Sequence, residues 1–406
     1  MGDLRRVLAT AYDAVDASLK RKLLRASPHN VLRLELPAVR RVPGKDRYQV
    51  AADLLARWRE SGVMRLDDDP SYFVFAHDFR LDGRDLTQLG VVCLCSLHDW
   101  SEGEILPHER TMKAPLEDRF HHLAALRATF SLGILVSSDS RSILLNHLVE
   151  VSRTPPLAVA RRGPAETHRM WQLAPDRVPA EVLATLRAGP LYMGDGHHRF
   201  EAALKYRQGL APAPGAPEHM HMAYIVSSAD PGLLVLGAHR VIRSRVEAEP
   251  VLRNAGWVRT ERVTTARFRP PGALTGLEPE ALDGAPAIWL IGPRHAERLV
   301  LPEESLRRWR VPGMSSIWNR QVSGLLHRQL IASLSEGDGD RVIYTRDTAL
   351  AIDMVANGSA SAALLLPPTP LEQVIAVADA GEILPAKSTH FFPKPPAGMV
   401  MRLLDV

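Results

Sequence analysis

The stretch 191–206, LYMGDGHHRFEAALKY, decides the fold around it. Its first residues are apolar, as in a buried strand, and FEAALKY has the spacing of a helix with one apolar face. Between the two, Gly194 and Gly196 allow a sharp turn and a close approach of a ligand to the backbone. Strands and helices also alternate along the rest of the chain, so the sequence predicts a mixed α/β fold (α+β in its flanking parts).

The elbow between this strand and this helix carries groups suited to phosphate. The first N–H groups of a helix lack partners within the helix, and its dipole favours an anion there. His197, His198 and Arg199 add further donors at the same place. A carboxylate at Asp195 suits a metal ion or proton transfer instead. The structural alternative is a tight turn with Asp195 as the helix N-cap and solvated histidines.

Three further segments hold candidate site residues. ILPHERTMKAPLEDR (105–119) is either part of a site or a charged loop that leads into a helix. AHR (238–240) places an arginine after an apolar strand, where a structural role is the alternative. AKSTHFFPKPPAG (386–398) contains two of the seven lysines and either binds phosphate or forms a hydrated latch. The candidates in these segments are Glu109, Arg119, Arg240, Lys387, Ser388 and Thr389.

Composition excludes several classes of protein. The chain has 406 residues, 46% hydrophobic and 24% charged, which is typical of globular proteins with more than one core. No apolar run is long enough for a membrane span, and the first residues do not resemble a secretory signal. The net charge of +4 argues against nucleic acid as a partner. Cys93 and Cys95 lie in a predicted buried strand, so we expect a reducing, cytoplasmic location.

The pattern of predicted elements divides the chain into three parts. These are an N-terminal α+β unit (1–98), a core (99–245) and a C-terminal α/β unit (246–406). In the first part, ASPHNVLRLELP (26–37) predicts a short strand. Known nucleotide signatures such as GxxxxGK[ST] and GxGxxG are absent, as are HExxH, CxxC and GxSxG.

The order of these motifs resembles the domain of unknown function 1015 family over nearly the whole chain. The segments are LELP, PHERT with a following DR, GDGHHRFEAALKY, AHRVI and LPAKSTHFFPKPPAGMV. Near the start, AYDAVD (11–16) stands where the family often has a PYDV-like run. The DGHHR elbow is also similar to the nucleotide-binding corner of the ParB/sulfiredoxin fold. That group includes ParB-type CTP-binding proteins, sulfiredoxin and free serine kinases.

In the free serine kinases an upstream Glu, a helix, an apolar strand and a DGHHR-like elbow follow one another. Here that order is Glu109, LEDRFHHLAALRA, GILV and Asp195 to Arg199. The resemblance implies a ParB/sulfiredoxin-like core and a kinase that phosphorylates the hydroxyl of free serine or a similar amino acid. It implies that ATP or ADP is held with Mg²⁺ by the elbow, and that Glu109 or Asp195 accepts the hydroxyl proton. The elbow residues concerned are Gly194, Asp195 (also the metal ligand), Gly196, His197, His198 and Arg199.

Two other activities belong to the same group. A ParB-like protein would use the nucleotide as a switch without turning over a small molecule. Sulfiredoxin chemistry needs a catalytic cysteine, and Cys93 and Cys95 lie far from the elbow in sequence. The sequence leaves open whether the nucleotide is ATP, ADP or CTP, and whether the protein is a monomer or a homodimer.

Overall fold

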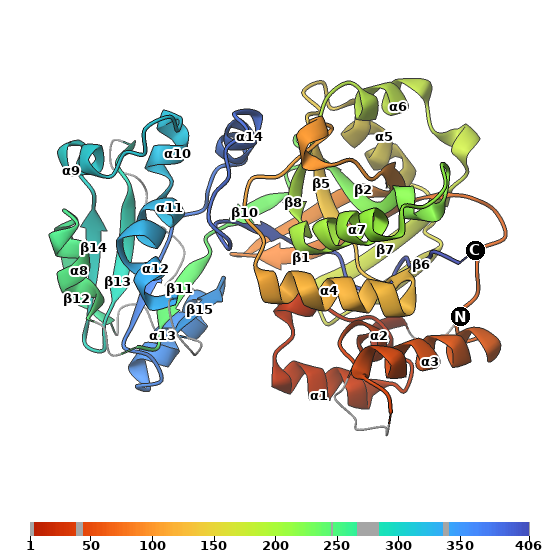
Figure 1. Ribbon diagram of the computed structural model, residues 1–406, viewed down its shortest axis with the longest axis horizontal. Helices are drawn as coiled ribbons and strands as arrows, with labels where there is room; N and C mark the ends of the chain where they lie inside the picture. The colour runs from red at the N-terminus through yellow and green to blue at the C-terminus, as the bar shows by residue number, and fades with distance from the viewer. Residues whose placement is uncertain (1–3, 38–43, 245–246, 266–283, 336–340, 406) are drawn as a thin grey trace. The chain divides into compact units, whose positions relative to one another are not determined.

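The computed structural model describes residues 4–37, 44–244, 247–265, 284–335 and 341–405 (Figure 1). Contacts between Cα atoms divide the chain into two compact units. The first comprises Met1–Pro107, Thr111–Leu233 and Pro393–Val406, and the second comprises His108–Arg110 and Leu234–Phe392. The three-part division expected from the sequence differs from this one. Its first two parts contribute strands to one sheet, through long-range pairing that local sequence patterns do not reveal.

The described part of the first unit is built on an eight-stranded mixed sheet in the order β3-β8-β5-β9-β2-β1-β7-β6. The pairs β3/β8 and β5/β9 are parallel and the others antiparallel. The hairpin between β1 and β2 turns at Asp82 and Gly83, as the sequence predicted. The strands are β1 (Tyr72–Leu81), β2 (Arg84–Ser96), β3 (Ile105–Leu106), β5 (Gly133–Ser137), β6 (Ala158–Arg161), β7 (Glu166–Leu173), β8 (Leu191–Asp195) and β9 (Met220–Ser227), with a separate pair β4 (Ala128–Thr129) and β18 (Arg402–Leu403).

Helices pack around this sheet. In Figure 1, α4 and α7 lie side by side, and contacts between the two confirm this. Phe200 and Leu204 of α7 and Leu144 and Leu148 of α5 are buried in one apolar core with residues of the sheet. The helices of this unit are α1 (Ala17–Ala26), α2 (Leu32–Glu35), α3 (Arg47–Glu60), α4 (Lys113–Leu126), α5 (Ile143–Ser152), α6 (Ala180–Arg187) and α7 (His197–Leu210).

The strand predicted within 26–37 is wrong, because Leu32–Glu35 form the single helical turn α2. The alternation of apolar and polar residues in LRLEL imitates a strand, and four residues are too few to distinguish the two periods. The Asn30 side chain holds the backbone at the start of this helical turn. Its Oδ1 accepts a hydrogen bond from the Leu32 N–H, and its Nδ2 donates to the carbonyls of Arg6 and Leu8.

In the second unit, the described strands form a six-stranded antiparallel sheet in the order β12-β14-β13-β16-β11-β15. Trp257 and Leu325 belong to its apolar core. The strands are β11 (His239–Ile242), β12 (Val258–Thr264), β13 (Ala287–Ile291), β14 (His295–Val300), β15 (Val342–Thr345) and β16 (Ala362–Leu365), with a separate pair β10 (Leu234–Leu236) and β17 (His390–Phe392). The helices are α8 (Ala248–Asn254), α9 (Glu303–Arg308), α10 (Ser316–Arg320), α11 (Val322–Leu326), α12 (Ala332–Ser335), α13 (Thr348–Ala356) and α14 (Leu371–Asp379).

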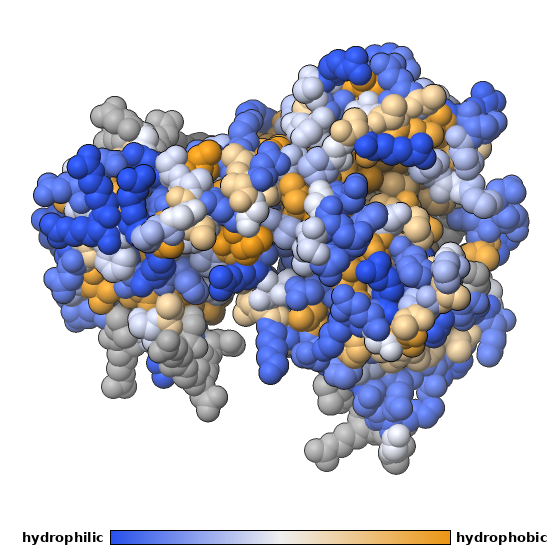
Figure 2. Space-filling model, turned by 45° about the horizontal axis from the view of Figure 1, so that its top comes forward, coloured by the Kyte–Doolittle hydropathy of each residue, from blue (hydrophilic) through white to orange (hydrophobic). Residues whose placement is uncertain are grey.

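The mixed α/β class expected from the sequence is therefore confirmed. Among the described residues, none of the helices combines the length and the apolar character that a bilayer crossing requires. On the face drawn in Figure 2, hydrophilic residues predominate and hydrophobic ones are interspersed among them.

Candidate functional site

The elbow at residues 194–199 has the predicted form of a strand that turns directly into a helix. Strand β8 ends at Asp195, Gly196 takes a φ of 99°, and α7 begins at His197. A Cβ atom at Gly196 would lie 3.0 Å from both Arg199 Nη2 and the Gly133 Cα. The turn therefore needs glycine both for its backbone angle and for space. Because Gly196 occupies the N-cap position, the alternative of Asp195 as N-cap does not hold.

Asp195 lies at the centre of a chain of charged groups. Its carboxylate accepts a hydrogen bond from Arg199 Nη2 at 2.9 Å and lies 2.6 Å from Lys394 Nζ. Lys394 Nζ also donates to Asp13 at 2.5 Å, so two carboxylates converge on one ammonium. The three side chains Asp195, Lys394 and Arg199 are 17%, 12% and 9% exposed. The charges are thus largely shielded from water. Ion pairs that are buried in this way are screened less by solvent and salt than exposed ones.

The protonation states follow from this arrangement. Burial alone would lower the pKa of Lys394, but the carboxylates of Asp195 and Asp13 outweigh it and raise that pKa. For Arg199, burial likewise acts to lower the pKa and Asp195 reverses the effect. Burial raises the pKa of Tyr12, the neighbour of Asp13, to about 12. Lys394 is therefore a fixed cation near neutral pH, and Tyr12 keeps its proton.

Arg199 also connects the elbow to Ser131 and Glu35 through hydrogen bonds. It donates to Ser131 Oγ at 2.9 Å, and Ser131 donates to Glu35 Oε1 at 2.9 Å. A small pocket of about 40 Å³ lies among these residues. Arg199 was expected to contact phosphate, but in this structure its guanidinium is held by protein groups.

The two histidines of the elbow differ in their exposure. His197 is 5% exposed. His198 is half-buried, and its Nε2 accepts a hydrogen bond from the Met112 N–H at 2.8 Å. The first turn of α7 is thereby tied to the residue that precedes α4.

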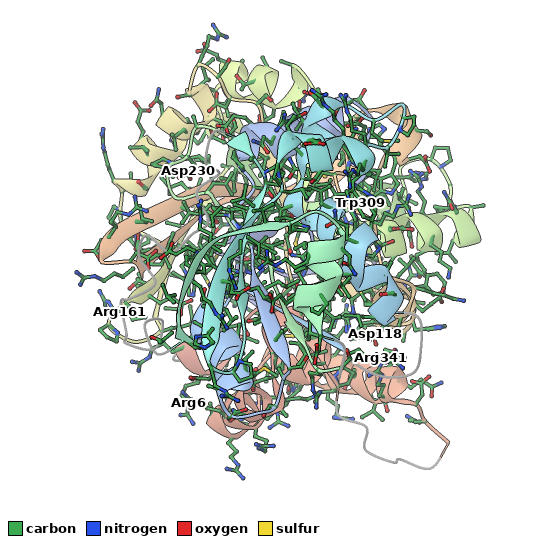
Figure 3. All side chains as sticks on the ribbon, turned by 90° about the vertical axis from the view of Figure 1, so that its left-hand side faces the viewer. Arg6, Asp118, Arg161, Asp230, Trp309 and Arg341 are labelled. Carbon is green, nitrogen blue, oxygen red and sulfur yellow. The ribbon has the colours of Figure 1, made fainter. Side chains whose placement is uncertain are left out.

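Arg119 lies within the protein near the elbow. It is 4% exposed and pairs with Asp118 at 2.5 Å and Glu35 at 3.3 Å. Its guanidinium also covers the Tyr12 ring at 4.4 Å. Asp118, labelled in Figure 3, accepts a further hydrogen bond from the Tyr48 hydroxyl at 2.7 Å. The predicted substrate contact at Arg119 is thus surrounded by other partners.

In the second unit, two segments that the sequence presented separately meet. The Glu109 carboxylate accepts hydrogen bonds from the backbone N–H groups of Lys387, Ser388 and Thr389 at 3.3, 3.0 and 3.3 Å. Lys387 has a φ of 63°, which turns these N–H groups toward one anion. Burial raises the pKa of Glu109, against the opposing effect of Lys387. Arg240 donates to the Lys387 carbonyl at 3.0 Å, and burial lowers its pKa to about 10.

The predicted site residues therefore fall into two groups. Gly194, Asp195, Gly196, His197, His198, Arg199 and Arg119 belong to the first unit, and Glu109, Arg240, Lys387, Ser388 and Thr389 to the second. Sequence reasoning missed three residues that meet the elbow, namely Tyr12, Asp13 and Lys394. Signals for them existed in the AYDAVD segment of the family resemblance and in the second lysine of residues 386–398.

The cysteines are not arranged as nucleophiles. Cys93 and Cys95 are both free and lie in β2, as expected. Burial raises the pKa of each thiol to about 12, so the reactive thiolate is scarce at neutral pH. This environment does not fit sulfiredoxin-type chemistry.

Comparison with known proteins identifies a family. The family described as "Protein of unknown function (DUF1015)" matches residues 2–257. No curated protein matches the sequence. Among solved structures, the chain is similar to a conserved hypothetical protein from Pyrococcus furiosus (15% identity, TM-score 0.40, covering 77% of this chain and 96% of that one). It is also similar to a free serine kinase in complex with AMP (15%, 0.38, 74% and 86%) and to SbnI with a C-terminal truncation from Staphylococcus aureus (13%, 0.39, 76% and 85%).

Proposed function

The chain belongs to the DUF1015 family, and from the chemistry of its elbow we propose that it is a phosphotransferase acting on a small amino acid. A phosphoryl group passes from ATP or ADP to the hydroxyl of free serine or a serine-like acceptor. The observation that carries the proposal is the convergence of Asp13 and Asp195 on Lys394 beside the N-terminus of α7. The elbow motif's resemblance to the free serine kinases supports the same reaction.

Phosphoryl transfer needs positioning and charge neutralisation more than covalent chemistry by the protein. The N-terminus of α7 favours the nucleotide phosphates through its N–H groups and dipole. Lys394 supplies a fixed positive charge, and a nucleotide phosphate would compete with Asp13 and Asp195 for it.

The residues present also fit a magnesium ion. Asp13 and Asp195 already converge on a cation, Lys394, and carboxylate oxygens are the ligands that Mg²⁺ prefers. These two side chains would hold the ion together with the substrate phosphates. When bound, Mg²⁺ neutralises charge on the transferring group.

The two candidate acids differ in their surroundings. Asp195 balances two cations, whereas burial raises the pKa of Glu109. A higher pKa makes a carboxylate a better proton acceptor near neutral pH. From the resemblance to the free serine kinases we propose Glu109 as the acceptor of the hydroxyl proton, and we assign the metal to Asp195.

The test is direct. Purified protein is incubated with Mg²⁺ and ATP or ADP and a panel of hydroxy amino acids, and phosphorylated products are detected by mass spectrometry. We expect one acceptor to be phosphorylated, and Lys394→Met and Glu109→Gln to lower the rate at least about 100-fold. Lys205→Met is the matched control, because Lys205 pairs with Glu117 on the exposed surface. The proposal fails if no nucleotide phosphorylates any acceptor. Nucleotide binding without product would favour a ParB-like switch.

A further inference from the structure

A second cluster of polar side chains lies on three neighbouring strands of the first unit. His77 of β1 is directly opposite His168 of β7 and directly opposite Gln88 of β2. Residues paired across strands project from the same face of a sheet, as do residues two apart on one strand. Glu166 precedes His168 by two positions, so all four side chains share one face.

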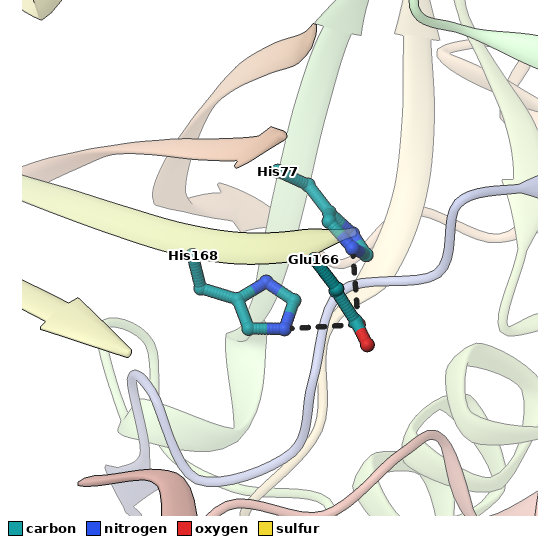
Figure 4. Close-up of side chains that lie close together, drawn as sticks. All are labelled: His77, Glu166 and His168. Carbon is teal, nitrogen blue, oxygen red and sulfur yellow. Dashed lines mark hydrogen bonds and ion pairs between the residues drawn. The ribbon is translucent and has the colours of Figure 1, made fainter. Parts of the chain in front are cut away.

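The side chains also meet in space. Figure 4 shows the two imidazoles directed at the Glu166 carboxylate. His77 Nε2 and His168 Nε2 each lie 3.1 Å from Glu166 Oε1, and one donor atom from each residue lies within 4.8 Å of the other two. His77 and His168 are 5% and 0% exposed, while the Glu166 side chain is 34% exposed. The buried pair of imidazoles therefore lies next to a carboxylate that is partly exposed to solvent.

Hydrogen bonding within the described residues accounts for only part of this cluster, because His77 Nε2 pairs with Glu166 Oε1 at 3.1 Å. His168 is buried with neither ring nitrogen in hydrogen-bonding geometry, and His77 Nδ1 is also without a partner there. Gln88 is 0% exposed, and neither its Oε1 nor its Nε2 has a described partner. Buried polar groups are nearly always satisfied, so several unpartnered ones together point to a bound species.

We propose that His77, Glu166 and His168 bind a divalent transition-metal ion, with Gln88 beside a fourth position open to water. Two histidines and one glutamate with an open position form a known type of zinc site. Tetrahedral Zn–N and Zn–O bonds of about 2.0–2.1 Å place ligand atoms roughly 3.3 Å apart. The 3.1 Å spacings to Glu166 Oε1 match that value.

Arg162 is a charged group next to the proposed ligands, and its Nη1 lies 3.9 Å from Glu166 Oε1. At that distance it does not hydrogen-bond to the oxygen, which stays available to an ion.

The site is chemically separate from the magnesium proposed at Asp13 and Asp195. Imidazole ligands suit zinc and its neighbours, whereas Mg²⁺ takes oxygen ligands. The inference therefore does not depend on phosphotransferase activity.

Metal binding by the full chain tests the proposal. Protein treated with EDTA is titrated with Zn²⁺ by calorimetry, and the zinc retained after gel filtration is measured by mass spectrometry. We expect one tightly bound Zn²⁺ per chain. Co²⁺ in its place should give the intense visible bands of a tetrahedral site. If the wild-type chain retains no Zn²⁺ at micromolar concentration, the proposal is overturned whatever any variant does.

Variants locate the ion. Glu166→Gln keeps the size of a partly exposed side chain and is the variant expected to fold normally. It should weaken Zn²⁺ binding at least about 10-fold, and His168→Gln should weaken it more. The control is His98→Gln, which removes another histidine–glutamate pair, with Glu102, outside the cluster. Zinc affinity equal to wild type in folded Glu166→Gln would place the metal elsewhere and refute the assignment.

Discussion

Replacing Asp195 by asparagine tests the charge network at the elbow. The change keeps the shape of the side chain and removes the charge that faces Arg199 at 2.9 Å and Lys394 at 2.6 Å. Removing one partner of a buried ion pair costs about 3–5 kcal/mol, because the other charge stays buried without compensation. Asp13 still pairs with Lys394, and Ser131 still accepts from Arg199. We therefore expect the lower end, about 3 kcal/mol.

Hydrogen exchange followed by mass spectrometry measures this loss where it occurs, since the two units need not unfold together. A loss of about 3 kcal/mol corresponds to exchange roughly 100-fold faster in peptides from β8 and α7. Lys394→Met added to Asp195→Asn should cost less than the sum of the two single changes, because the double variant no longer buries an unpaired ammonium. A loss below about 1 kcal/mol, with purely additive single changes, would refute the role given to Asp195.

Three other changes follow from the structure. Gly196→Ala introduces a Cβ at a φ of 99° and 3.0 Å from two neighbours, so it should lower the unfolding temperature and weaken nucleotide binding, whereas Gly189→Ala, with open space around it, should do neither. Burial lowers the pKa of His221 to about 3, so between about pH 6.5 and 3 the unfolded chain binds more protons than the folded one, and stability falls as the pH falls. From pH 7 to 5 we expect this group to lower the free energy of unfolding by about 2 kcal/mol, measured by urea unfolding. The substitution His221→Phe should make the free energy of unfolding depend less on pH. Replacing Cys93 and Cys95 together by serine should leave phosphotransfer within about twofold of wild type, because burial suppresses both thiolates; a large loss would restore thiol chemistry.

The elbow could be predicted from sequence because its determinants are local. An apolar strand, two glycines and a helix-period run occupy consecutive residues, and the structure has them in that form. The partners of the elbow could not be predicted in the same way. Asp13, Asp195 and Lys394 are far apart along the chain, and only tertiary folding brings the two carboxylates within 2.6 Å of the Lys394 ammonium.

Two other outcomes show where local patterns fail. The segment 386–398 was predicted either to bind phosphate or to form a hydrated latch, and the N–H groups of Lys387, Ser388 and Thr389 bind the protein's own Glu109 carboxylate. Successive backbone N–H groups that point to one place indicate a bound anion, but they do not show whether it is a ligand or a side chain of the protein itself. The cluster at His77 left no motif because its members come from three strands, and only the register of the sheet aligns them.

The return of Pro393–Val406 to the first unit has a consequence for biosynthesis. Lys394 follows the whole segment Leu234–Phe392 in the order of translation, and Arg402 and Leu403 pair with β4 only after that. At about 5–20 residues per second, the elbow is complete in sequence roughly 10–40 s before its lysine leaves the ribosome. During this interval Asp13 and Asp195 are carboxylates without their shared cation. A chain interrupted before Lys394 would therefore lack the charge balance of the finished site.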